Sequence, residues 1–278
     1  MRNLIGTVNR FSVFKRSRSS KEKTPFCALQ SLGAREEQED SYGICYDYWE
    51  SDSGSPKCFI LADGMGGHVG GSVASQMAVD AAKLSISETK VFGSRELMDT
   101  LSVANASVSE CLSVNPEFEG MGTTLVVTAF FDGRLFWLSI GDSPLFGINS
   151  RFELARLNED HSMKPVLDAL VESGDMNPNS DDYRRQSNQL RSALMGDEID
   201  LYELNDIGVP ISDWKYFLMA SDGLETLSQN EIESVVKKNS KKGPDAIGLG
   251  LIDAVDAKHK RKQDNVTLIV LEAQAFGR

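Results

Sequence analysis

The sequence predicts an α+β fold in which the strands pair antiparallel. Short apolar and β-branched runs, bounded by turn residues, predict strands in several parts of the chain. In residues 120–156 such runs follow one another directly, and Asp132-Gly133 between two of them is a hairpin turn. Longer helical patterns follow Gly71 and Ser228, and a short one covers Pro165–Glu172. Antiparallel strands together with helices are typical of an α+β domain.

The overall composition is that of a globular protein. The chain has 278 residues, of which 41% are hydrophobic and 25% are charged. One large domain or two small ones can therefore bury a core. The net charge of −12 argues against a general nucleic-acid binder, because the body repels phosphate backbones. No apolar run approaches the ~18 residues that a membrane span needs.

The small number of cysteines and histidines limits which metal ions the protein is expected to bind. The cysteines are Cys27, Cys45, Cys58 and Cys111. They form no C-x-x-C pair, so we expect reduced core thiols in a cytosolic protein. The only histidines are His68, His161 and His259, which gives little support to a zinc site. A bound metal is then expected to have oxygen ligands, which favours Mg²⁺ or Mn²⁺.

Residues 1–24 differ from the rest of the chain. They contain seven Lys or Arg and one acid, a net charge of +6, which leaves −18 for the remainder. We expect a disordered basic tail, followed by one folded domain over 25–273. Contact with a membrane surface, a docking role or a transit peptide are the alternatives that this composition leaves open.

The first strands surround a glycine-rich turn. Strands are expected over 26–32 and over Ser41–Tyr48, and a third apolar run, 58–62, ends at Asp63. Glycines after that run let backbone oxygens approach a ligand closely. The Asp63 carboxylate and the Gly64 carbonyl therefore suit a hard metal ion, although a tight turn with a capping Asp explains the same pattern.

An acidic loop precedes the second strand. Glu39 and Asp40 are candidate metal carboxylates, and Arg35 is a candidate phosphate clamp because guanidinium matches phosphate geometry. The alternative is a solvated acidic loop.

Two helices are expected after the glycine turn, each with a stripe facing the core. The first stripe is Val73, Met77, Ala78, Ala81 and Leu84; the second is Leu97, Leu101, Ala104, Val108 and Leu112.

An antiparallel meander is expected over residues 120–156, with Asp142 at a strand end. A third acidic turn follows at 158–162. Residues 164–189 are expected to hold a short helix over Pro165–Glu172 within a mobile, lid-like surface segment. A further strand is expected near Leu201–Leu204.

The C-terminal part repeats the opening theme. The apolar run 216–220 leads to Asp222-Gly223, as 58–62 leads to Asp63-Gly64. Ser228 and Glu231 form a capping box, and Pro244 opens a last helix. Asp264 stands just before a final strand over 266–271.

Acidic residues thus recur at strand junctions. They are Glu39, Asp40, Asp63, Asp142, Asp222 and Asp264. Carboxylates packed together repel one another, and divalent cations relieve that repulsion. Two metals about 3.5–4 Å apart can activate a bridging water for in-line attack on phosphorus. Arg35 then fixes the phosphoryl oxygens, and no protein nucleophile is required.

At this point the chain resembles a known family, the metal-dependent Ser/Thr protein phosphatases of type 2C (the PPM family) in its bacterial form. The resemblance spans roughly residues 26–272, and its motifs come in family order. The matching segments are Gly33-Ala34-Arg35 with Glu39-Asp40, Ala62–His68, Met121–Thr124, Gly141-Asp142-Ser143, Glu159–Ser162, Ser221-Asp222-Gly223 and Asp264–Thr267.

The resemblance implies a four-layer α-β-β-α sandwich of two antiparallel sheets, with the metals in a cleft at one end. It implies hydrolysis of phosphoserine and phosphothreonine in proteins by a metal-bridging water or hydroxide, in signalling that opposes a Ser/Thr kinase. Arg35, Asp63 and Asp222 are the catalytic candidates. We expect a cytoplasmic monomer with phosphoprotein substrates.

The resemblance also implies a ligand set for two Mn²⁺ or Mg²⁺ ions and a third. Asp63 bridges two metals and the Gly64 carbonyl binds one, while Asp222 and Asp264 complete the first. The second metal is served, directly or through water, by Glu39 and Asp40. The implied third site is Asp142 with Asp222. By the same resemblance Arg35 binds phosphate, and residues 164–189 take the place of the flap.

Two positions depart from the family pattern. Pro144 stands where an arginine usually follows Gly-Asp-Ser, which removes a cation near the site. Met65 replaces a histidine proposed as general acid in some eukaryotic members, and His68 is expected to be structural. Two alternatives stay open: a catalytically weak member with a regulatory role, and another two-metal hydrolase such as a nuclease. The intact aspartates and the acidic body disfavour them.

Overall fold

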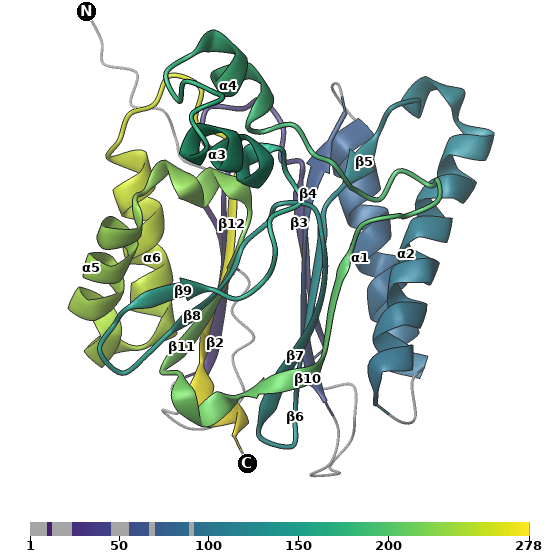
Figure 1. Ribbon diagram of the computed structural model, residues 1–278. Coiled ribbons are helices and arrows are strands. Elements are labelled where there is room, and N and C mark those ends of the chain that lie inside the picture. The colour runs from purple at the N-terminus through teal and green to yellow at the C-terminus, as the bar shows by residue number, and fades with distance from the viewer. Residues whose placement is uncertain (1–9, 13–23, 46–55, 67–69, 89–91, 278) are drawn as a thin grey trace, which may run out of the picture.

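The protein is a sandwich of four layers, helix–sheet–sheet–helix (Figure 1). The computed structural model describes residues 10–12, 24–45, 56–66, 70–88 and 92–277. Every strand pairing recorded between the described residues is antiparallel. The predicted fold class is therefore confirmed.

The two sheets draw on strands from distant parts of the chain. Sheet A has the order β1 (Arg10–Ser12), β2 (Phe26–Ser31), β12 (Val266–Glu272), β11 (Tyr216–Ala220), β8 (Leu145–Ile148) and β9 (Leu154–Arg156). Sheet B has the order β10 (Glu203–Pro210), β7 (Arg134–Ile140), β6 (Leu125–Phe131), β4 (Lys57–Met65) and β3 (Asp40–Cys45), and β5 (Gly122–Thr123) pairs with the end of β4.

Each sheet is covered on its outer face by two helices. Sheet B packs against α1 (Gly70–Glu88), which α2 (Ser94–Val114) covers, and sheet A packs against α5 (Gln229–Asn239) and α6 (Pro244–Asp256). Short 3-10 helices are η1 (Pro116–Phe118), η2 (Ile211–Asp213), η3 (Asp222–Thr226), η4 (Ser240–Lys242) and η5 (Ala273–Phe276).

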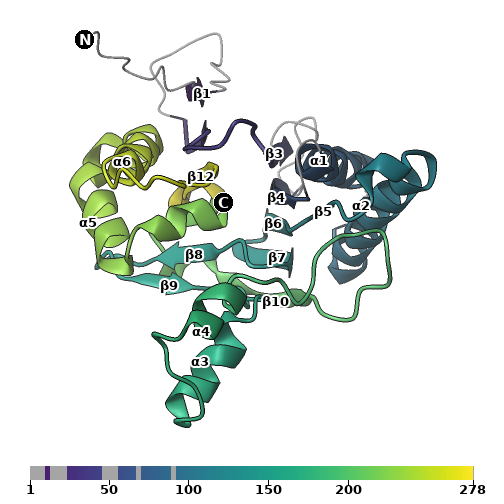
Figure 2. The ribbon, with the colours of Figure 1, turned by 90° about the horizontal axis from the view of Figure 1, so that it is seen from above.

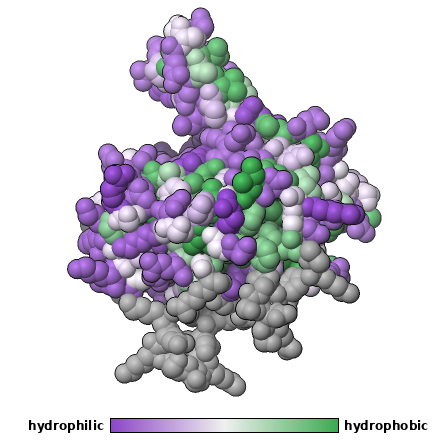
Figure 3. Space-filling model, turned by 60° about the horizontal axis from the view of Figure 1, so that its bottom comes forward, coloured by the Kyte–Doolittle hydropathy of each residue, from purple (hydrophilic) through white to green (hydrophobic). Residues whose placement is uncertain are grey.

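A helical projection stands out from this body. It consists of α3 (Lys164–Glu172) and α4 (Asp181–Gln186) and is plain in Figure 2. Figure 3 shows it as a knob on which polar and apolar residues are mixed. The Ser180 hydroxyl caps α4 by accepting from the Tyr183 N–H, a helix start that the sequence interpretation missed within the expected lid.

The core lies in three layers, two of them between a sheet and its helices. The third lies between the sheets, where the ring of Phe59 meets those of Phe130 and Phe276 edge to face. Edge-to-face aromatic contacts add about 0.5–1.5 kcal/mol beyond burial. This core layer joins residues of both sheets, such as Phe59 of β4 and Phe217 of β11, so the ends of the two sheets keep a fixed spacing.

Several local predictions are confirmed. The β6–β7 hairpin turns at Asp132-Gly133, with Phe131 opposite Arg134. The capping box of Ser228 and Glu231 is present, and Pro244 occupies the first turn of α6. The predicted stripe of α2 is buried except at Leu112, which is partly exposed. All four cysteines are buried free thiols.

The predicted core face of α1 was correct for Ala78, which is buried, and for Val73 and Met77, which pack against the core, but it was wrong at Leu84. Leu84 is 58% exposed, whereas Ala74, Val79 and Ile86 are buried. Alanines let α1 lie close to sheet B while α2 covers its other side, so small side chains rather than the largest ones mark the buried face.

The single meander over 120–156 was also wrong. β7 belongs to sheet B and β8 to sheet A, so the chain crosses between sheets at Gly141-Asp142-Ser143. The strand expected near 201–204 is β10, which starts at Glu203. Of the strand expected over Ser41–Tyr48, residues 46–48 lie outside the described residues.

Two further findings concern membranes and the N-terminal tail. No helix among the described residues is long and apolar enough to cross a membrane. Within the tail, Arg10–Ser12 form β1 at the edge of sheet A, and residues 1–9 and 13–23 lie outside the described residues.

Candidate active site

The two Asp-Gly repeats of the sequence come from different sheets and meet at one end of the sandwich. Asp63 lies on β4 in sheet B, and Asp222 follows β11 in sheet A. The Ser221 hydroxyl donates to Asp40 Oδ2 at 2.8 Å and accepts from the Thr267 N–H at 2.9 Å. Ser221 thus links the carboxylate of one sheet to two strands of the other.

β4 does not end at Asp63, as the apolar run suggested. It continues through Met65, because Gly64 and Met65 pair with Thr123 and Gly122 of β5. The Asp63 N–H donates to the Thr124 hydroxyl, and the Thr123 hydroxyl donates to the Asp63 carbonyl, both at 2.9 Å. These bonds fix the backbone of Asp63 and so aim its carboxylate.

Position 64 requires glycine because the backbones of Glu39 and Gly71 lie very close to it. The Gly64 N–H donates to the Glu39 carbonyl at 3.1 Å. A Cβ at this position would lie 2.1 Å from the Gly71 carbonyl oxygen and 2.5 Å from that of Glu39. Only glycine lets the start of α1, the acidic loop and β4 come this close.

The acidic loop before β3 is tied to the start of β12. Asn265 Oδ1 accepts from the Glu39 N–H, and its amide nitrogen donates to the Leu32 and Glu37 carbonyls. Arg35 Nη2 lies 2.5 Å from Asp264 Oδ2, and its Nη1 lies 3.8 Å from Glu39 Oε2. Arg35 is half-exposed, so its guanidinium can reach a ligand entering from solvent.

A cation that the sequence interpretation missed lies beside Asp142. Arg156 Nη2 donates to the Asp142 carbonyl at 2.6 Å, and Nη1 lies 3.3 Å from Asp160 Oδ2 and 3.6 Å from Glu225 Oε1. Arg156 thus places a cation beside Asp142, although Pro144 stands where the family usually has an arginine. Arg156 ends β9, fourteen residues after Asp142, and the β8–β9 pairing brings it back beside that residue.

Four other aspartates repel the Asp63 carboxylate. Desolvation raises its pKa well above the ordinary value, and the charges of Asp40, Asp222, Asp142 and Asp264 raise it further. These acids, from both sheets, therefore form one electrostatic cluster.

Three neighbours of Asp63 are shifted in the same direction. Desolvation, with the charges of Asp142 and Asp264, raises the pKa of Asp222 to about 8. Desolvation raises the pKa of Asp40 to about 6, against hydrogen bonds that lower it. For Asp142, desolvation and then Asp160 raise the pKa to about 6.

This donor set fits divalent cations. Hard oxygen donors that repel one another are suited to Mg²⁺ or Mn²⁺, which cancel the repulsion. Within the described residues, no three His, Cys, Asp or Glu side chains converge as a ready-made metal cage. Arg35 pairs with Asp264. The candidate ligands therefore lie in one region, but their oxygens do not surround a single metal position.

All predicted site residues of the described chain lie in this region. Asp40, Asp63, Asp142, Asp222 and Asp264 form the electrostatic cluster, and Glu39, Gly64 and Arg35 adjoin it. Ser221 and Asn265 lie in motifs of the family, but the sequence did not predict their supporting roles. No motif pointed to Arg156. His161 is buried, with Nδ1 accepting from the Gly141 N–H, and His68 lies outside the described residues.

Comparisons with known proteins agree with this geometry. A family model described as Protein phosphatase 2C matches residues 34–241. Protein phosphatase PhpP of Streptococcus pneumoniae is 33% identical over 184 residues, which cover 64% of this chain and 71% of that protein. Serine/threonine phosphatase stp of Listeria monocytogenes is 28% identical over 244 residues, covering 86% and 91%.

Solved structures share the fold. The crystal structure of the Mycobacterium tuberculosis serine/threonine phosphatase PstP/Ppp has a TM-score of 0.71 at 26% identity, covering 89% of this chain and 97% of that one. The structure of serine/threonine phosphatase Stp1 from Staphylococcus aureus has a TM-score of 0.72 at 25% identity, covering 94% and 99%.

Proposed function

This chain belongs to the protein phosphatase 2C family, and from that premise we propose how its own residues carry out phosphate hydrolysis. The family consists of metal-dependent Ser/Thr protein phosphatases, and this protein is a signalling Ser/Thr phosphatase. The observation that carries the proposal is the convergence of five aspartates from two sheets on one electrostatic cluster beside Arg35.

The residues proposed to hold the cations are those of the cluster and its rim. Asp63, the Gly64 carbonyl, Asp222 and Asp264 would hold one Mn²⁺ or Mg²⁺. Glu39 and Asp40, with Asp63, would serve a second, and Asp142 with Asp222 a third. The bound cations supply activation of a water and neutralisation of charge on the phosphoryl group.

The protein's own groups place the substrate. Arg35, whose Nη2 pairs with Asp264, is proposed to turn its guanidinium to two phosphoryl oxygens, since guanidinium binds phosphate in a bidentate way. Its pairing with Asp264 keeps the guanidinium at the site before substrate arrives. The hydrogen bonds to Thr123 and Thr124 hold Asp63 in one orientation, which favours a fixed line of attack.

His161 is assigned a structural role. Its ring is fully buried, and Nδ1 is engaged with the backbone of Gly141, at the sheet crossing that carries Asp142. Desolvation lowers the pKa of His161, so the ring is neutral at pH 7.

We propose phosphoserine and phosphothreonine proteins as substrates, opposite a Ser/Thr kinase that makes them. The names of the relatives support this class of substrate. A cytoplasmic monomer is also proposed, and the four free buried thiols support a reducing compartment.

The test is hydrolysis of an aryl phosphate and a phosphothreonine peptide with Mn²⁺, with Mg²⁺ and with chelator. The expected result is turnover of both substrates that needs the metal and is lost with chelator. Turnover that persists in chelator, or folded protein inactive with both metals, would overturn the proposal.

A further inference from the structure

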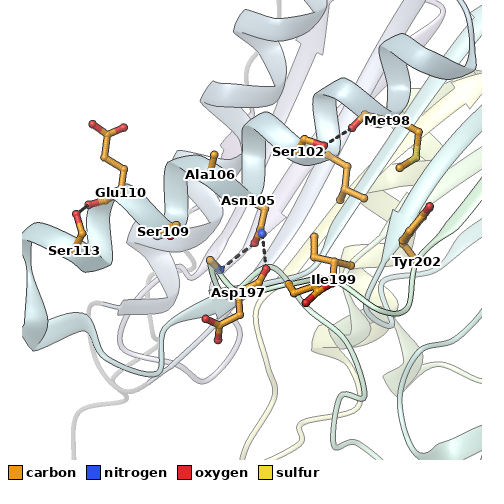
Figure 4. A pocket seen from close by; sticks show the side chains of 13 residues that line it. Met98, Ser102, Asn105, Ala106, Ser109, Glu110, Ser113, Asp197, Ile199 and Tyr202 are labelled. Carbon is orange, nitrogen blue, oxygen red and sulfur yellow. Dashed lines mark hydrogen bonds between the residues drawn. The ribbon is translucent and has the colours of Figure 1, made fainter.

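A groove outside the acidic cluster runs along α2. One wall is the exposed face of α2 from Met98 to Ser113, and the other is the segment from Gly196 to Tyr202 (Figure 4). Its volume is about 710 Å³. At ~1.5 Å per helical residue this face of α2 is roughly 22 Å long, which matches six or seven residues of extended chain.

The two walls are fixed to one another. The Asn105 amide nitrogen donates to the Asp197 carbonyl at 2.7 Å, and its Oδ1 accepts from the Gly196 N–H at 2.9 Å. Gly196 has a φ of +83°, and a Cβ there would lie 2.7 Å from Ser109 Cα. The groove is therefore built into the fold and is not a gap between loosely placed segments.

The lining combines an apolar floor with a negative rim. Leu101 is buried in the floor, and Met98, Ile199 and the 40% exposed Tyr202 flank it. The rim carries Glu110, Asp197 and Glu198, all exposed. Among the described residues that line the groove, none is basic.

The groove continues toward the candidate active site. A second hollow of about 310 Å³ shares Asp197 with it and is also lined by Met195 and Met121. Beside that hollow, Leu194 and Thr123 exchange backbone hydrogen bonds at 2.8 and 3.0 Å. Thr123 in turn donates to Asp63, so one backbone pairing separates this surface from the cluster.

We propose that this groove docks a lysine- and arginine-rich segment of the phosphoprotein substrate, an inference that rests on the proposed phosphatase function. Basic side chains suit the site because their aliphatic stems pack on an apolar floor while their charges meet the acidic rim. Tyr202 adds an aromatic face for a cation. The phosphorylated residue then lies at the cluster while the flanking segment occupies the groove.

The test compares two phosphothreonine peptides that differ only in their flank, with four lysines in one and four glutamines in the other. The wild-type protein is expected to favour the basic peptide in kcat/KM by about five- to tenfold at low salt, the sum of two or three exposed ion pairs. The double variant Glu110→Lys/Glu198→Lys should lose this preference and keep its activity on aryl phosphate.

A matched control is Asp213→Lys, an exposed acid on η2 beyond the far end of β10. It should keep the preference, because it changes the net charge without touching the groove. A glutamate-flanked peptide should gain on the double variant and not on the control. Equal use of both peptides by the wild type, or a preference unchanged in the double variant, would overturn the groove proposal.

Direct binding separates the two proposals. A fluorescent, unphosphorylated lysine-rich peptide should bind the wild type and bind the double variant at least fivefold more weakly. If no substrate is turned over but this difference holds, the phosphatase proposal fails and the docking surface stands. If turnover is normal and binding does not differ, the docking surface fails alone.

Discussion

Asp222 lies where sheet A ends, with negative charge on several sides. Desolvation and the charges of Asp142, Asp264 and Asp40 raise the pKa of its carboxyl to about 8. A group held so unfavourably is a cost to the metal-free fold. This cost is explained if Asp222 binds metal, because a bound cation would stabilise the ionised carboxylate.

We predict that Asp222→Asn lowers metal-dependent kcat by at least about a hundredfold, as loss of a direct ligand does. The metal-free variant should unfold at a temperature no lower than the wild type, since a repelled carboxyl has been removed. Steady-state kinetics with Mn²⁺ and thermal unfolding with chelator measure the two effects. Near-normal turnover would remove Asp222 from the ligand set.

Arg35 is predicted to act mainly in substrate binding. Arg35→Ala should raise KM for the phosphothreonine peptide more than it lowers kcat, because the guanidinium is proposed to contact phosphoryl oxygens already in the ground state. Arg35→Lys should recover only part of the loss, since lysine lacks the bidentate fork. A KM unchanged in Arg35→Ala would refute this role.

At the scale of residues, the sequence predicted the acidic cluster because each of its members lies in a short recognisable motif. It did not predict the Arg156 contacts, because they depend on how β9 turns back beside β8. Spacing along the chain does not show which strands pair, so the sequence indicated only the arginine missing at Pro144.

At the scale of elements, the site depends on how closely three segments meet. The end of β4, the start of α1 and the acidic loop touch through Gly64, Gly71 and Glu39. Gly71 is less tightly enclosed, since a Cβ there would lie 2.7 Å from the Glu39 Oε1 side-chain atom and 3.0 Å from the Gly64 backbone.

We predict that Gly64→Ala destabilises the fold by about 2–4 kcal/mol and abolishes turnover, because backbone must move to admit a methyl group. Gly277→Ala is the control, since its Cβ would meet nothing closer than 3.7 Å. Urea unfolding midpoints give the comparison. Equal midpoints for the two variants would show that the close approach at Gly64 is not required.

Several elements followed from local rules, whereas the partners of the elements did not. The capping box, Pro244 and Asp132-Gly133 act within a few residues, so their predictions held. The change of sheet at Asp142 and the buried alanine face of α1 depend on long-range packing, which overrides local pattern.

The whole molecule joins two sheets whose ends carry like charge, so its stability should depend on pH and metal together. Asp40, Asp142 and Asp222 have pKa values raised to about 6, 6 and 8, against 3.8 ordinarily. Between pH 5 and 8 the folded state therefore binds more protons than the unfolded chain, and the free energy of unfolding falls as pH rises.

We predict that the metal-free protein has a lower melting temperature at pH 8 than at pH 5.5. Mn²⁺ should raise the melting temperature at both values and by more at pH 8, because the cation replaces the protons that the carboxyls have lost. Thermal unfolding at the two pH values, with chelator and with Mn²⁺, measures this. A metal-free melting temperature that increases from pH 5.5 to 8 would contradict the account.

The fold as a whole was predictable because its motifs match a family with one architecture. The groove along α2 was not, since its walls are 80 or more residues apart in sequence and meet through Asn105. A hydrogen bond between a helix and a loop far away in the chain cannot be recognised from the sequence of either segment.

The most direct test of the central claim is calorimetric titration of Mn²⁺ into the wild type, Asp63→Asn and the control Asp213→Asn. Asp63 is the carboxylate that every other aspartate of the cluster repels, so its loss should affect more than one ion. We predict at least two Mn²⁺ per wild-type and control chain, and at least one fewer, with at least about tenfold weaker binding, in Asp63→Asn. An isotherm for Asp63→Asn that matches the wild type would show that the cluster is not the metal centre.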